Sequence, residues 1–113
     1  GVFALSVDEL IEKAKVLKGL QKTIAAEEIL RDTLLRRNSD PSLWFLLSEI
    51  QKDNFNVAGY HQSRAEYFIL LGQNEKALNE LQFALKLSQD NFQTFEIIMT
   101  KINDLREKLN KRI

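Results

Sequence analysis

The sequence predicts an all-α protein of about six short antiparallel helices, and three observations lead to that fold class. Apolar residues recur three and four positions apart in segment after segment, which is the spacing of one helix face. No stretch alternates apolar and polar residues for long enough to form a strand. The single proline and most of the four glycines fall at or between the periodic segments. Short turns make neighbouring helices antiparallel, so we expect stacked hairpins.

The first two helices are marked by their ends. Ser6 is followed three residues later by Glu9, a capping-box pattern that starts the first helix, and Gly19 is the expected C-terminal cap. A second helix is predicted from Thr23 to Arg37, where the basic end suits the negative end of the helix dipole.

The third and fourth helices have equally clear boundaries. Asp40 can cap free amides and Pro41 fits the first helical turn, so the pair starts the third helix. Asn54 and Asn56 mark the next turn, and the fourth helix is expected to stop at Gly72.

The last two helices complete a single domain over residues 1–113. Asn74 is expected to cap the fifth helix, and the sixth starts near residues 90–91. Residues 1–5 are predicted to be a flexible tail and residues 91–113 a terminal capping helix. The apolar stripe from Phe95 to Leu109 must pack on the fifth helix, or else it forms a homodimer or partner surface.

Composition limits the function. Hydrophobic residues make up 44% and charged residues 28% of the chain, which is typical of a folded, soluble domain. Sixteen basic and sixteen acidic residues cancel, so we expect no nucleic-acid partner. No apolar run approaches the roughly 20 residues that cross a bilayer, so we expect no membrane insertion. The chain starts at Gly1 without an initiator Met or a leader, and we expect it to be part of a longer protein.

A repeat of roughly 34 residues is the pattern to seek in stacked helix pairs. The run from residue 61 to residue 89 has small, large and turn residues where a tetratricopeptide (TPR) repeat has them: Ala65, Phe68, Gly72, Ala77, Leu81 and Ala84. The same template fits the first hairpin at Leu10, Ala14, Leu17, Ala26 and Leu30. A third register opens at Trp44 and Leu47, but Tyr60 and Tyr67 then replace small residues. The fourth helix can therefore serve as the second member of one pair and the first member of the next.

The sequence also resembles a narrower family. Tyr60-His61-Gln62, Ala65-Glu66-Tyr67, Gly72 and the run Ala77 to Leu85 are similar to the C-terminal TPR domain of periplasmic zinc metalloproteases of the β-barrel assembly-enhancing type. Asp40 to Trp44 and the terminal helix extend the resemblance over most of the chain. It implies a periplasmic location, and partners among the outer-membrane assembly machinery or its substrates. No HExxH motif stands in this sequence, so the protease activity does not carry over. The alternative is a free-standing cytoplasmic scaffold or secretion chaperone.

Protein or peptide ligands are expected in the concave groove, which the resemblance assigns to the first helix of each pair. The expected groove residues come from three helices: Ile11, Lys15, Lys18, Phe45, Glu49, Lys52, Gln62, Glu66, Ile69 and Leu70. Trp44 is expected in the core, because it matches a packing position of the repeat. Its neighbour Phe45 points about 100° away and is the better aromatic anchor for a ligand.

Catalytic and cofactor residues are not expected. His61 is the only histidine and the chain has no cysteine, so a zinc site would need carboxylates almost alone. We therefore expect His61 to be a packing or surface residue and the chain to bind no metal or cofactor. The enzyme alternative would use His61 with Glu66 as an acid-base pair.

Overall fold

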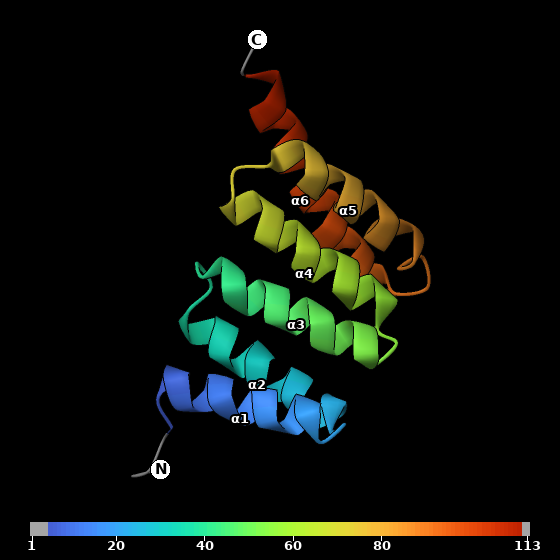
Figure 1. Ribbon diagram of the computed structural model, residues 1–113. Coiled ribbons are helices and arrows are strands. Elements are labelled where there is room, and N and C mark those ends of the chain that lie inside the picture. The colour runs from blue at the N-terminus through green and yellow to red at the C-terminus, as the bar shows by residue number, and fades with distance from the viewer. Residues whose placement is uncertain (1–4, 112–113) are drawn as a thin grey trace.

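The computed structural model describes residues 5–111 and confirms the all-α class (Figure 1). Within the described residues there are six helices: α1 (Val7–Gly19), α2 (Thr23–Arg36), α3 (Pro41–Asp53), α4 (Val57–Leu70), α5 (Asn74–Lys86) and α6 (Phe92–Asn110). The expected tail lies outside the described residues apart from Leu5, as do the last two residues of the expected capping helix. Every helix described between residues 5 and 111 is too short or too polar to cross a bilayer.

Local capping chemistry sets most of the helix starts. The Ser6 hydroxyl accepts a hydrogen bond from the backbone of Glu9, and the Glu9 carboxylate accepts one from the backbone of Ser6, so the predicted capping box is present. Asp40 and Asn91 cap α3 and α6 through their side chains. The prediction for Asn74 was wrong, because α5 starts at this residue and its cap position is Gln73, which makes no capping bond through its side chain.

The ends of α1, α3 and α4 share one turn geometry. In each, a residue with positive φ follows the helix, and two backbone amides bond to carbonyls of the last turn in a Schellman motif. Gly72 holds this position after α4, as predicted. After α1 the position belongs to Gln21 rather than to Gly19, which is the last helical residue. After α3 it belongs to Phe55, with φ of 58°.

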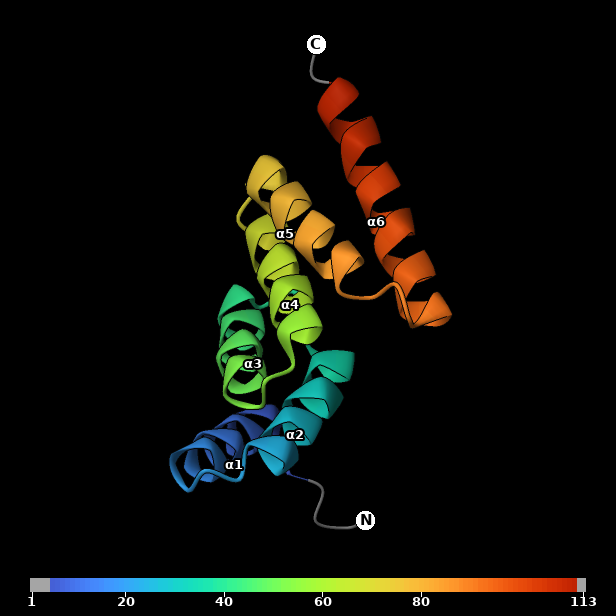
Figure 2. The same cartoon turned by 90° about the vertical axis from the view of Figure 1, so that its right-hand side faces the viewer.

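The helices pack in sequence order, each against its neighbours along the chain. In Figure 1, α1, α3, α4 and α5 form a row, and α2 and α6 lie behind it; Figure 2 shows both at the same side of that row. The molecule is elongated, with extents of 48 × 29 × 24 Å. This is helical repeat-like packing, in which each element contacts its neighbours rather than one central core.

Two clusters of buried apolar residues hold the helices together. The first joins α1, α2 and α3 around Ala14, Leu30 and Ile50. The second joins α4, α5 and α6 around Ala77 and Ile98, with Ile102 and Leu105 also buried. The central part of the predicted terminal stripe is therefore covered within the chain. Small residues at Ala65, Ala77 and Ala84 are fully buried, as the repeat template requires of closely crossing helices.

Buried polar residues lie at the boundary between the two clusters. Between α3 and α4, the buried Ser63 hydroxyl donates to the Gln51 carboxamide oxygen at 2.5 Å. Ser48 is also fully buried and donates to the Phe45 carbonyl of its own helix. Polar groups that must be paired when buried restrict how two helices can approach, so this boundary fixes the α3–α4 geometry.

Candidate functional site

A groove of about 810 Å³ crosses the middle of the molecule and is the candidate functional site. Its floor is the face of α4 that carries Ala58, Gln62 and Glu66. In Figure 2, α2 lies below α4 and α6 to its right, and these two helices supply two walls, to which α3 adds further lining residues. We call this feature the central groove. Its volume is in the range of sites that bind small molecules and cofactors.

Three apolar side chains on the walls of the central groove are exposed. Leu35 on α2 is 86% exposed, Ile97 on α6 is 56% exposed, and Leu87 after α5 is 53% exposed. Trp44 lies between the groove and the first apolar cluster, against which it packs. Its indole Nε1 donates to the Asn38 carbonyl at 2.8 Å, which holds the ring in place. The groove therefore offers apolar surface to a ligand on both walls.

The charged groups of the central groove are paired within the chain. Arg31 donates to the Glu27 carboxylate, with its Nε 2.9 Å from Oε2. Lys101 on α6 pairs with Glu66 on α4, a contact between a wall and the floor. Burial lowers the pKa of the Lys101 ammonium, against the opposing attraction of Asp104. Neither Arg31 nor Lys101 therefore offers an unpaired positive charge to a ligand.

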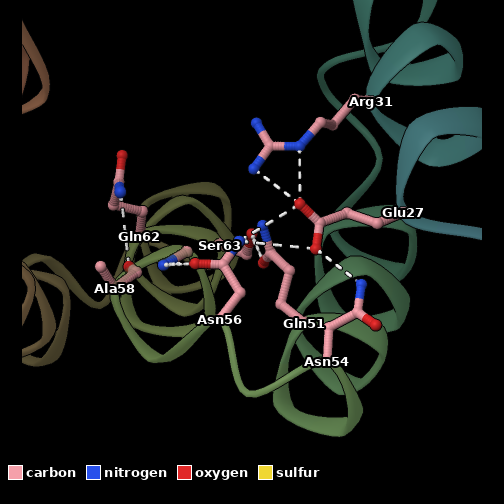
Figure 3. A network of polar contacts seen from close by, with 9 residues as sticks. Glu27, Arg31, Gln51, Asn54, Asn56, Ala58, Gln62 and Ser63 are labelled. Atoms are coloured by element: carbon pink, nitrogen blue, oxygen red, sulfur yellow. Dashed lines mark hydrogen bonds and ion pairs between the residues drawn. The ribbon is translucent and has the colours of Figure 1, made fainter. Parts of the chain in front are cut away.

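A polar network fixes one edge of the central groove (Figure 3). The Glu27 carboxylate of α2 accepts hydrogen bonds from Asn54 at 3.2 Å and from Asn56 at 3.2 Å, both in the α3–α4 turn. The Asn56 side chain in turn caps α4 by accepting from the Gly59 amide at 3.1 Å. Thr23 also donates to Asn54. This network joins α2 to the start of α4, so the α2 wall and the floor of the groove keep a fixed position relative to each other.

Gly59 is required where the network meets α4. A Cβ atom at this position would lie 2.5 Å from Asn56 Nδ2 and 2.6 Å from Gln51 Nε2. Both side chains are engaged in hydrogen bonds and cannot move away freely. The glycine therefore allows two polar side chains to approach the backbone of α4.

Two of the residues predicted for the groove lie in it: Gln62 and Glu66. The other eight do not line the central groove. Ile11 packs against the first apolar cluster and Ile69 against the second. Lys15 pairs with Glu12, and Lys18 with Asp53. Glu49, Lys52 and Leu70 lie elsewhere on α3 and α4, and Phe45 packs on the Tyr67 ring with centroids 5.5 Å apart.

The prediction did not name the residues of α2 and α6 that line the central groove, among them Leu35, Ile97 and Lys101. It placed groove residues on the first, third and fourth helices, whereas α2 and α6 also contribute to this groove. The repeat template makes α1 the first helix of one hairpin and α4 the first helix of another, so no sequence pattern pointed to α2 or α6.

His61 lies away from the central groove, between α4 and α5. Its Nδ1 is 2.6 Å from Glu80 Oε2, and its ring stacks on Phe83 at 5.2 Å. Arg64 bonds the other oxygen of the same carboxylate at 3.1 Å. The alternative acid-base pair of His61 with Glu66 does not form, because Glu66 faces Lys101. Within residues 5–111, no three His, Asp or Glu side chains gather as a metal site would require.

The helices and the groove define the class of this protein as an all-α chain with helical repeat-like packing and an open central groove. No known protein family matches the sequence, and no curated protein is significantly similar to it. The TPR resemblance therefore rests on the residues of this chain alone.

Proposed function

We propose that this chain is a protein-interaction module, a short right-handed solenoid of the TPR kind that holds a segment of another protein in its central groove. The observation that carries the proposal is the exposure of Leu35, Leu87 and Ile97 on the walls of one groove. Large apolar side chains gathered in a concave site are typical of ligand-binding surfaces. Arg31 and Lys101 are each paired with a carboxylate of this chain, which supports a ligand that is held by shape and apolar contact.

The resemblance to the periplasmic metalloprotease domain supports a periplasmic setting for this protein binding. In that setting the module recruits outer-membrane proteins, or the machinery that inserts them, for a catalytic domain elsewhere in a longer protein. A cytoplasmic scaffold or secretion chaperone with the same groove is the alternative, since helical repeats serve many unrelated functions.

Site-specific photocrosslinking in cells tests the proposal. A photoreactive amino acid replaces Gln62 on the floor of the central groove, and in a matched variant it replaces Lys13 of α1, which is exposed and does not line the groove. We expect a protein adduct at position 62 that position 13 does not give. Equal adducts at both positions, or none at position 62, would refute the groove as the binding site.

The identity of the adduct distinguishes the two settings. An outer-membrane protein or a component of its assembly machinery at position 62 would support the periplasmic setting. Cytosolic partners alone would refute that setting and leave the interaction module in place.

A further inference from the structure

The apolar groups of the central groove lie on its walls, whereas its floor is polar. Leu35 belongs to one wall and Ile97 with Leu87 to the other, and Gln62, Ser63 and Glu66 lie along α4 between them. Among residues 5–111, the Gln62 amide donates to the Ala58 carbonyl of its own helix alone, at a long 3.4 Å. Its carboxamide oxygen accepts no hydrogen bond from residues 5–111, so the floor keeps hydrogen-bonding capacity for a ligand.

This arrangement matches an extended chain. In an extended segment successive side chains point to opposite sides, and the backbone amides and carbonyls point along the perpendicular direction. Such a segment can place alternate side chains against the two apolar walls while one edge of its backbone meets the carboxamide of Gln62.

A helix fits the groove less well. A helical ligand satisfies its own backbone and binds through one apolar stripe, which in this groove would rest on Gln62 and Glu66. Burying the Gln62 carboxamide oxygen under an apolar stripe leaves it without water or a partner, which is unfavourable.

Charge also selects the ligand. Glu66 is engaged by Lys101, and Glu27 by Arg31. A charged ligand side chain entering the groove would lose water and would have to break one of these ion pairs to find a counter-charge.

We propose that the central groove binds an extended, uncharged polypeptide segment whose successive apolar side chains contact Leu35 on one wall and Ile97 and Leu87 on the other. The proposal rests on the proposed function and adds the conformation and chemistry of the ligand. An unfolded strand-forming segment of another protein has these properties, because β-branched residues favour extended backbone.

Three end-capped, fluorescein-labelled peptides test the proposal with the full chain. The first is uncharged and rich in Val, Ile and Thr, the second is an amphipathic helix of Leu, Ala, Glu and Lys, and the third is acidic and extended. Fluorescence anisotropy measures binding to the wild type, to Leu35→Ser and to Ile97→Ser. The control is Ile24→Ser, because Ile24 is 72% exposed on α2 and lies outside the groove.

We expect the uncharged extended peptide to bind most tightly and each wall variant to weaken it about tenfold, the effect of removing one partly buried aliphatic contact. Ile24→Ser should bind like the wild type. Tighter binding of the helical or acidic peptide, weakened by the same wall variants, would overturn this inference and leave the proposed function standing. Failure of all three peptides to bind would count against both.

N-methylation of the peptide tests the extended conformation directly. Methylating every second backbone amide blocks one edge of an extended chain. We expect one alternating set to abolish binding and the opposite set to leave it nearly unchanged. Equal loss with both sets would overturn the proposed conformation.

Discussion

Replacing Gly59 by Ala sets two measurable effects against each other. Gly59 is the third residue of α4 after its cap Asn56, and Ala in a helix is favoured over Gly by about 1 kcal/mol. Helix propensity alone therefore predicts that Gly59→Ala stabilises the protein. The surroundings of the added Cβ predict the opposite, because it would lie 2.5 Å from Asn56 Nδ2 and 2.6 Å from Gln51 Nε2.

The cost follows from the hydrogen bonds that these side chains make. Ordinary contacts between heavy atoms need about 3.5 Å, so both side chains must shift by roughly 1 Å. Displacing Asn56 weakens the cap of α4, which is worth about 0.5–2 kcal/mol. Displacing Gln51 weakens its buried bond to Ser63, at a cost of about 1–3 kcal/mol. After subtracting the helix-propensity gain, we expect a net loss of about 0.5–4 kcal/mol in the free energy of unfolding.

Equilibrium unfolding in urea, followed by far-ultraviolet circular dichroism, measures this loss. Gly19→Ala is the matched control, since a Cβ at Gly19, the last residue of α1, meets no atom within 4 Å. We expect the control to be unchanged or slightly stabilised, by less than about 1 kcal/mol. Amide hydrogen exchange at residue 59 should also accelerate in Gly59→Ala as its bond to Asn56 weakens. If Gly59→Ala unfolds at the same or a higher urea concentration than the wild type, the assigned role of the network is wrong.

Three further predictions concern turns and polar contacts. Glu27→Gln should lower the free energy of unfolding by about 1–3 kcal/mol, because an NH₂ group would then face donors of the network. The control is Glu28→Gln on the exposed face of α2, and an equal effect of both substitutions would contradict the prediction. Phe55→Gly should raise the melting temperature, because Phe55 is 89% exposed and has a positive φ that costs a residue with a side chain about 1–2 kcal/mol. Gly72→Ala should lower the melting temperature, because Gly72 has a φ of 74°. Changes of the same sign in both variants would argue against turn strain. The Ser42 hydroxyl lowers the pKa of Asp40, so the stability that this carboxylate contributes is present above its unfolded pKa and is lost as the pH falls through its folded pKa. In acid titrations the wild type should therefore lose stability relative to Asp40→Asn below about pH 4. Parallel titration curves of the two proteins would refute this prediction.

The helices could be predicted from the sequence because the signals that form them are local. Ser6 with Glu9, Asp40 with Pro41, and Asn91 each act within a few residues of their own helix end, and the structure has them where the sequence places them. Turn residues were harder to predict. Gln21 and Phe55 adopt the left-handed conformation that glycine usually supplies, because the antiparallel packing of neighbouring helices imposes the same turn on them as on Gly72.

The central groove could be predicted only in part. Gln62 and Glu66 follow from the helical period of α4, which sets the face that they share. The face of α3 that meets α4 depends on contacts such as Gln51 with Ser63, and these direct Phe45 toward Tyr67 and Trp44 toward the groove. Periodicity identifies the residues that share a face but not the partner that the face meets.

By itself the sequence determined six helices, most of their caps and the small residues at their close crossings, because each depends on a few neighbouring positions or on one repeat. The tertiary structure alone decided that α2 and α6 stand as opposite walls over α4. It also brought Lys101 to Glu66 and Asn56 to Glu27, pairs that lie about one repeat apart along the chain. The physical reason is that packing between helices selects one of several faces that each sequence segment offers, and this selection creates the groove.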